Sequence, residues 1–163
     1  IGDERTFSQD PKYVLRILSD IGVRALSPGI NDPTTATDVL NVVERLLGYL
    51  AARNLGDGLQ CDDAGELRVE FPVADWEDFV SVALDEIRLY GIQSAQVSRR
   101  LICVLETLIA DVPEKRRPVL LDRLDRTRRA VAALYPDPDD RALALAPDAQ
   151  GLGGTRPSVG TSD

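Results

Sequence analysis

Residues 24–36 read Arg-Ala-Leu-Ser-Pro-Gly-Ile-Asn-Asp-Pro-Thr-Thr-Ala, and this stretch joins the two clearest helical patterns in the chain. Pro28-Gly29 suits a type II turn, because proline fixes φ at one central position and glycine accepts the positive φ needed at the next. Asp32-Pro33 is a helix start, an N-cap side chain followed by proline at the first helical position. The stretch therefore predicts a helix–turn–helix corner around which the rest of the chain is arranged.

Helical periodicity continues on both sides of this corner. Asp10-Pro11 repeats the helix-start signal, and apolar residues then recur at helical spacing until the helix is expected to end near Leu26. The apolar stripe after the corner predicts a second helix that ends near Arg53. Caps such as Asp75 and Ser94, apolar stripes and stop signals predict further helices over residues 75–91, 94–112, 114–134 and 137–146. Ile21, Tyr90 and Leu134 fall on the apolar stripes and are expected in the core.

One short region changes period, because apolar residues alternate with charged ones over residues 67–71. We predict a small β-hairpin at about 59–71, inserted between the second and third helices. The expected fold is mainly α, an irregular antiparallel bundle of five or six helices with this hairpin. Residues 1–146 are expected to form a single soluble helical domain. Residues 147–163 are dominated by Gly, Ser, Thr, Pro and Asp, and we expect a disordered tail there.

The composition excludes several functional classes. The chain has 163 residues and no histidine, which removes Ser-His-Asp and Cys-His nucleophile systems and the usual zinc sites. The formal net charge of −8 argues against nucleic acid and against an anionic lipid surface. No run of about 18 apolar residues exists, so we expect no direct bilayer insertion by this segment. The sequence predicts no cofactor and no resident metal.

The corner is the first candidate site. Turn and cap chemistry alone accounts for its residue types, and we favour that structural interpretation. The alternative is a cation site built from the Asp32 carboxylate, the Asn31 carbonyl and Asp20, since hard cations prefer oxygen ligands. An anion site is disfavoured, because Asp32 already occupies the positive end of the helix dipole. The candidate ligand, ion or docking residues are Arg5, Asp10, Asp20, Arg24, Ser27, Asn31, Asp32, Thr34 and Thr35.

Arginines and carboxylates form three further patterns. Arg5, Asp10 and Arg24 are expected to tie the start of the chain to the corner by salt bridges, and the alternative is a recognition site for a polar ligand or for the membrane portion of the protein. Asp85-Glu86 is disfavoured as a catalytic pair, because adjacent helical residues point about 100° apart. A basic stripe on the outer face of the helix over 114–134 is either a solvated face or a docking face for an acidic partner or a second copy. This candidate interaction face consists of Arg123, Arg126, Arg128 and Arg129.

Motifs along nearly the whole chain before the tail carry a resemblance to a known family. They are Arg5-Thr6, Gln9-Asp10-Pro11, the 24–36 stretch, Leu55-Gly56-Asp57-Gly58, Trp76-Glu77-Asp78-Phe79, Asp85-Glu86-Ile87-Arg88, Tyr90-Gly91 and residues 136–142. They resemble a family of predicted bacterial integral membrane proteins, the domain of unknown function 2254 family. The resemblance implies an upstream transmembrane region, absent from this sequence, and a soluble C-terminal portion, which is this chain. It carries over no catalytic residues.

We therefore expect a non-catalytic assembly or regulatory domain of a bacterial integral membrane protein. It would dock onto the transmembrane portion of the same protein and form a homo-oligomer with its own copies. The cell membrane is the expected location, with this domain on the cytoplasmic side. The alternative is an ion- or small-ligand-sensing domain at the corner that gates transport through the membrane region. A hydrolase working through Asp and Thr is disfavoured, because the sequence has no histidine and no nucleophile motif.

Overall fold

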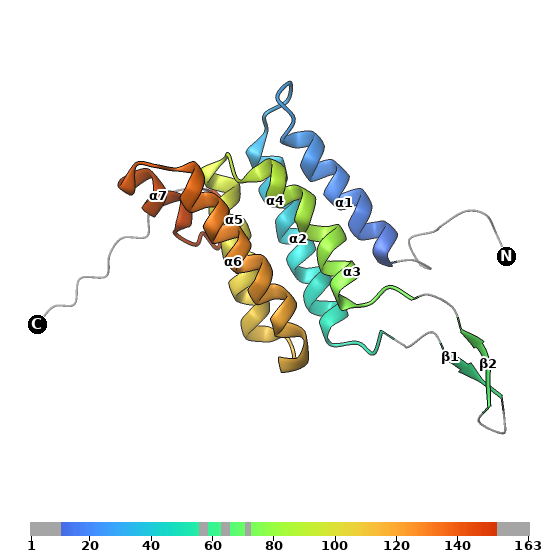
Figure 1. Ribbon diagram of the computed structural model, residues 1–163. Helices are drawn as coiled ribbons and strands as arrows, with labels where there is room; N and C mark the ends of the chain where they lie inside the picture. The colour runs from blue at the N-terminus through green and yellow to red at the C-terminus, as the bar shows by residue number, and fades with distance from the viewer. Residues whose placement is uncertain (1–10, 56–58, 63–65, 71–72, 153–163) are drawn as a thin grey trace, which may run out of the picture.

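The computed structural model describes residues 11–55, 59–62, 66–70 and 73–152. In this part of the chain the helices are α1 (Pro11–Ala25), α2 (Pro33–Ala51), α3 (Trp76–Val80), α4 (Glu86–Gly91), α5 (Ala95–Asp111), α6 (Arg117–Leu134) and α7 (Pro138–Leu145). A π-helical turn, η1 (Ser81–Asp85), joins α3 and α4 into one rod, and a 3-10 turn, η2 (Glu114–Arg116), precedes α6. Successive rods reverse direction in Figure 1. The mainly α fold expected from the sequence is confirmed.

A two-stranded antiparallel hairpin, β1 (Leu59–Cys61) and β2 (Leu67–Glu70), lies between α2 and α3. Leu59 pairs with Glu70, and the register shifts after Gln60. Figure 1 shows the hairpin extending away from the helices. These strands occupy the region where the sequence predicts a hairpin. Residue 71, its expected last residue, lies outside the described residues.

Side-chain caps start the helices at the predicted places. The Asp75 carboxylate accepts a hydrogen bond from the Asp78 backbone N–H at 2.8 Å, and the Asp78 carboxylate accepts one from the Asp75 N–H at 3.2 Å. This reciprocal pair is a capping box at the start of α3. Ser94 caps α5 by accepting from the Val97 N–H at 3.4 Å. Proline lies in the first turn of α6, where its missing N–H has no helical acceptor.

The core lies where α2 packs against α5, with α1 and α6 covering the two outer sides of that pair. Complete burial of a large aliphatic side chain contributes roughly 1.5–3 kcal/mol, so this layer dominates the stability of the bundle. The largest fully buried side chains are Leu15, Leu40, Leu47, Leu84, Ile87, Leu101, Ile102, Leu105, Leu108 and Leu120.

Three apolar residues expected in the core are exposed instead, namely Ile21, Tyr90 and Leu134. Tyr90 is displaced by η1, because a π-turn spans one residue more than an α-turn and shifts the apolar stripe that follows. The buried position after Ile87 is therefore Gly91. Ile21 lies on the exposed side of α1, and Leu134 is in the last turn of α6.

The segment after α7 differs from the expected tail. Residues 147–152 run back along α5, where the Asp148 N–H donates to the Arg99 carbonyl at 3.2 Å. The Gln96 side-chain amide donates to the Gly151 carbonyl at 2.6 Å, and Gly151 is buried beside Thr37. The helical domain therefore continues at least to residue 152. The rest of the expected tail, residues 153–163, lies outside the described residues.

Candidate functional site

The corner between α1 and α2 is a tight turn closed by backbone hydrogen bonds. The Ser27 carbonyl accepts from the backbone N–H of Ile30 at 3.0 Å and from that of Asn31 at 2.8 Å. The Asp32 N–H donates to the Ala25 carbonyl at 2.8 Å, so the end of α1 is bonded directly to the start of α2. The connector is thus a reversal closed by backbone hydrogen bonds, and Ile30 within it is exposed.

The reversal uses a different residue from the one predicted. Asn31 has a φ of 47°, and among the described residues it is the one non-glycine residue with positive φ. The positive-φ glycine in the described part of the chain is Gly151, so Gly29 does not adopt the left-handed conformation. The predicted type II turn at Pro28-Gly29 is therefore wrong. Asparagine takes this role because its short polar side chain tolerates left-handed backbone better than most residues.

The Asp32 carboxylate is fully engaged at the start of α2. Its Oδ1 accepts from the Thr35 backbone N–H at 3.1 Å, and its Oδ2 accepts from the Thr35 hydroxyl at 2.5 Å. These bonds stabilise the charged form, so they hold the pKa of Asp32 below its ordinary value of 3.8. The Thr34 carbonyl accepts from the Thr37 hydroxyl at 2.8 Å. Of the two adjacent threonines, Thr35 therefore binds the capping carboxylate of Asp32, and Thr34 accepts a hydrogen bond through its backbone carbonyl.

Asp20 does not join Asp32 in a cation site. Asp20 pairs with Arg16 one turn earlier on α1, and Arg16 also binds the Glu86 carboxylate of α4 at 2.6 Å and 2.9 Å. Hydrogen bonds to Glu86 and Asp20 raise the pKa of Arg16, and the bond from Arg16 lowers the pKa of Glu86. No group of three or more Cys, Asp or Glu side chains placed to hold a metal occurs in the described part of the chain.

Some of the remaining corner candidates lie outside the described residues, and the others lie at the end of α1 and in the connector. Arg5 and Asp10 lie outside the described residues, so the proposed tie between them and the corner stays a prediction. Arg24 is exposed at the end of α1, and no side chain in the described ranges pairs with it. Ser27 contributes its backbone carbonyl to the turn. Arg24 is thus an exposed, charged candidate side chain that takes no part in the hydrogen bonds of the corner.

The basic stripe of α6 is neutralised by neighbouring carboxylates. Three of its members are exposed and paired, Arg126 with Asp122 at 3.0 Å, Arg128 with Glu106 at 2.5 Å and Arg129 with Asp125 at 2.5 Å. Arg123 is not on the outer face, since it is only 6% exposed and points toward α3 and η1. The sequence expectation placed Arg123 wrongly, because helical periodicity cannot show that a buried arginine meets carboxylates across the helix interface.

Arg123 is the centre of a polar cluster beneath η1. Its Nη2 donates to the Ser81 hydroxyl at 2.8 Å and to Glu77 at 3.2 Å, while its Nε lies 3.3 Å from the Asp85 carboxylate. Burial alone would lower the pKa of Arg123, but the charge of Asp85 and the hydrogen bond to Asp122 raise it overall. Ser81 and Asp85 are four positions apart, so they lie on the same side of the rod and both reach Arg123. Arg123 itself is buried, whereas the carboxylates of Glu77 and Asp122 that pair with it reach the surface.

Other buried arginines were not singled out from the sequence. Arg100 of α5 donates to the Asn41 side chain at 2.6 Å and pairs with Glu44, both on α2. Arg116 of η2 donates to backbone carbonyls at the end of α2. An Arg beside an otherwise apolar stripe was the available signal, because buried charged side chains are rare unless paired.

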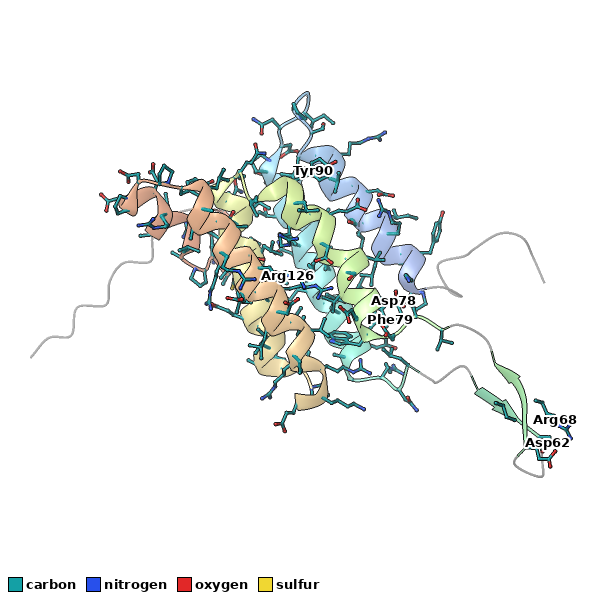
Figure 2. All side chains as sticks on the ribbon, in the orientation of Figure 1. Asp62, Arg68, Asp78, Phe79, Tyr90 and Arg126 are labelled. Atoms are coloured by element: carbon teal, nitrogen blue, oxygen red, sulfur yellow. The ribbon has the colours of Figure 1, made fainter. Side chains whose placement is uncertain are left out.

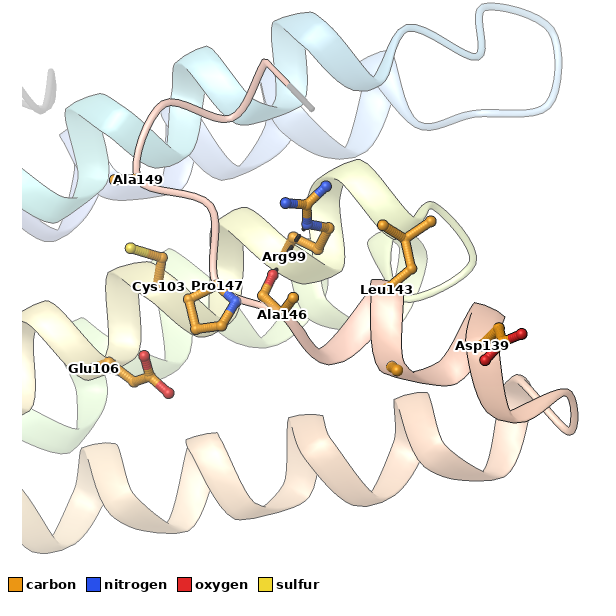
Figure 3. Close-up of a pocket in the computed structure, with 9 residues that line it drawn as sticks. Arg99, Cys103, Glu106, Asp139, Leu143, Ala146, Pro147 and Ala149 are labelled. Atoms are coloured by element: carbon orange, nitrogen blue, oxygen red, sulfur yellow. Dashed lines mark hydrogen bonds between the residues drawn. The ribbon is translucent and has the colours of Figure 1, made fainter. Parts of the chain in front are cut away.

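A groove of about 740 Å³ lies between α5, α7 and the segment that follows α7. Figure 3 shows the Cys103 and Glu106 side chains of α5 on one side, and Ala146 and Pro147 on the other. The Arg99 Nε–H donates to the Ala146 carbonyl at 3.0 Å, and Glu106 is paired with Arg128. Most of the lining is small and apolar, so the groove could hold an apolar group. It contains no acid–base pair.

The proteins that this chain resembles are described without an activity. A family model described as "Predicted membrane protein (DUF2254)" matches residues 1–107. Similar relatives are uncharacterized proteins of Mycobacterium bovis and of two strains of Mycobacterium tuberculosis, each 35% identical over 146 residues. That match covers 89% of this chain and 28% of each relative, so the chain spans less than a third of their length. No solved structure matches. No helix in the described ranges is long and apolar enough to cross a membrane.

Proposed function

We propose that this chain, which belongs to the DUF2254 family of predicted membrane proteins, is the extramembrane assembly and regulatory domain of a longer membrane protein. In this proposal the domain is non-catalytic. It docks onto the membrane-spanning portion of its own protein and onto its own copies. By docking, it stabilises one conformation of the membrane-spanning portion.

One contrast carries the proposal. The family is described as membrane proteins, yet the described residues form a bundle with its own apolar core and no helix that could span a membrane. Relatives have about 72% of their length outside the match, since the match covers 28% of them. A packed domain attached to a much longer membrane protein is best suited to assembly or regulation, because its candidate sites contain no catalytic constellation.

A second function, small-ligand sensing, has support at the groove rather than at the corner. The two oxygens of Asp32 are occupied by Thr35, which leaves the corner without a free carboxylate pair. The groove between α5 and α7 has a volume within the range of small-molecule sites, about 300–1,000 Å³. A ligand bound there would contact both α5 and α7 and could regulate how they pack.

Separate expression of the two portions tests the main proposal. This chain and the membrane-spanning remainder of the longer protein are produced as two polypeptides, and the tagged chain is used to recover the remainder from detergent extracts. We expect the two polypeptides to co-purify. We also expect this chain to sediment with membranes that contain the remainder. A chain that stays monomeric and never recovers the remainder would refute the docking role.

We also propose a cytoplasmic position for the domain. Cys103 is a free, half-buried thiol, and unpaired thiols are more common in reducing compartments. A cysteine placed at the exposed position Arg129 in the full-length protein should react with a membrane-impermeant maleimide in inverted vesicles. Labelling in intact spheroplasts instead would place the domain outside.

A further inference from the structure

Four large apolar side chains are exposed at the end of the bundle where α1, the connector and α4 meet. They are Ile21, Ile30, Leu89 and Tyr90, and we call this surface the corner end. Ile30 is 55% exposed, Leu89 56% and Tyr90 54%. Single exposed apolar residues are ordinary, but several at one end of a domain are typical of an interaction surface. Tyrosine is also among the residues enriched at protein interfaces.

The last turn of α4 lies beside the connector. α1 and the α3–α4 rod run in the same direction, with Lys12 bound to Asp78 at 2.9 Å near their starts. At their other ends, a methyl group added to Gly91 would lie 3.4 Å from Leu26 Cδ1. Figure 2 shows Tyr90 at this end of the bundle, close to the connector. Ile30 and Tyr90 therefore lie at the same end, although 60 positions separate them in the chain.

The connector presents Ile30 in a fixed conformation. The bonds to the Ser27 and Ala25 carbonyls hold the turn, and the left-handed Asn31 reverses the chain directly after Ile30. A side chain held in place before binding loses little further freedom on binding, which favours affinity. The turn within residues 24–36 thus does more than connect two helices, because it keeps the Ile30 side chain exposed to solvent.

An exposed cation lies next to this surface. Arg24, in the last turn of α1, is exposed and has no partner in the described ranges, as is also true of Arg45 and Lys115, whereas the exposed arginines of α6 are paired with carboxylates. The chain as a whole has a net charge of −8, which opposes adsorption to an anionic lipid surface. A protein partner with an apolar surface and an acceptor for Arg24 fits better than a bilayer.

We propose that the corner end is the surface through which the domain docks onto the membrane-spanning portion of its own protein, with Ile30 as the anchor and Arg24 as the polar contact. This inference rests on the proposed function and names its contact surface. The occupant is argued from the length of the relatives, because the match covers 28% of each and leaves about 72% of a protein from a family described as membrane proteins outside it.

Site-specific photocrosslinking in the full-length protein tests this assignment. A benzophenone amino acid replaces Ile30 or Tyr90, and Leu121 of α6, which is 50% exposed, is the matched control. After irradiation in native membranes, mass spectrometry identifies the attached peptide. We expect attachment to membrane-portion peptides from positions 30 and 90, and much less from position 121.

The other outcomes separate the two proposals. Attachment to the membrane portion from position 121, with none from 30 or 90, would overturn the corner end and leave the docking role intact. Attachment from 30 and 90 to lipid, or to the same domain of another copy, would overturn the assigned occupant. No attachment to the membrane portion from any of the three positions would count against the corner end and the proposed function together.

Binding between the separately produced portions gives a second measurement. Ile30→Ser and Arg24→Gln should each weaken binding at least fivefold, as expected when an interface anchor is removed. Leu121→Ser should leave it unchanged. Each variant alters an exposed side chain, and circular dichroism checks that the fold is retained. Equal binding by all three variants would overturn the proposal.

Discussion

Arg116 and Trp76 make two direct contacts with each other at the C-terminal end of α2. The Trp76 Nε1–H donates to the Arg116 carbonyl at 3.0 Å, and the Arg116 guanidinium lies 5.1 Å from the Trp76 ring centroid. That guanidinium donates to the Leu50 carbonyl at 2.8 Å and to the Arg53 carbonyl at 2.6 Å. The Leu50 carbonyl also accepts from the Arg53 backbone N–H at 3.0 Å, so Arg116 supplies a further donor at the end of α2 and a donor for the Arg53 carbonyl just beyond it.

Arg116→Met should lower the free energy of unfolding by about 2–4 kcal/mol, because two carbonyls near the core lose charged donors. Urea denaturation measures the change. Arg129→Met is the matched control, since Arg129 is exposed and pairs only with Asp125 one turn away on α6. Its effect should be below about 0.5 kcal/mol. Similar losses in the two variants would show that Arg116 does not cap α2.

Gly29 and Asn31 should respond oppositely to alanine. Gly29 lacks a positive φ, and a methyl group there would meet no atom within 4 Å. Gly29→Ala should therefore be neutral or stabilise the protein by up to about 1 kcal/mol through the unfolded state. Asn31→Ala should destabilise it by about 1 kcal/mol, because alanine tolerates the left-handed conformation poorly. The reverse order in thermal melts would restore the type II turn that Pro28-Gly29 predicts.

Acid should destabilise the fold through carboxylates that α1 binds. The bond from Lys12 lowers the pKa of Asp78 from 3.8, and the bond from Arg16 lowers the pKa of Glu86 from 4.5. A depressed folded-state pKa adds stability above the ordinary value, and that stability is lost as the pH falls through the folded-state value. Unfolding free energy should therefore decline below about pH 4.5 and continue to decline below pH 3.8. Arg16→Gln should flatten this decline, and Arg129→Gln should not.

Gly151 is the residue that fixes the segment returning over α5. Its φ is 69°, and a methyl group there would lie 3.0 Å from Thr37 Cβ. Gly151→Ala should destabilise the protein by about 1–2 kcal/mol, since backbone strain and a tight contact act together. Hydrogen exchange should also become faster at the Asp148 amide, which bonds to the Arg99 carbonyl. Unchanged stability and exchange would show that residues 147–152 do not need this conformation.

Local signals in the sequence identify the helices well, and tertiary contacts account for what they miss. Asp32, Asp75 and Ser94 cap helices where predicted, because capping depends on residues three positions apart. The exposure of Tyr90 could not be predicted from periodicity, because it depends on one extra residue in η1. The inward direction of Arg123 depends on carboxylates 38 and 46 positions away. Non-local pairings of this kind leave no periodic pattern.

The site predictions divide in the same way. Local turn and cap signals identify the residues that shape the corner, since Asp32, Thr35 and Asn31 each have a defined backbone role. The bonds from Thr35 to both Asp32 oxygens are what the favoured structural interpretation requires, and ligand binding at the corner stays a prediction. The exposure of Ile21 and Tyr90 cannot be predicted from periodicity, because both residues fall on the apolar stripes of their helices.

Arg123 should be the most important arginine of α6 for stability. Removing it leaves Asp85 partly buried without its charged partner, and loss of one member of a buried ion pair typically destabilises by about 3–5 kcal/mol. The side chain of Asp85 is 29% exposed, so water will screen part of that effect, and about 2–3 kcal/mol is expected for Arg123→Met. Arg128→Met is the control, because its pair with Glu106 is exposed, and it should change stability by less than about 1 kcal/mol.

A double-mutant cycle separates the ion pair from simple packing around Arg123. If Asp85 is the partner that matters, Asp85→Asn should reduce the additional effect of Arg123→Met, giving an interaction energy of about 1 kcal/mol or more. Additive effects would mean that Arg123 acts mainly through Ser81 and Glu77, whose bonds would then hold α3 against α6. Equal effects for Arg123→Met and Arg128→Met would instead return Arg123 to the outer face of α6, where the sequence alone placed it.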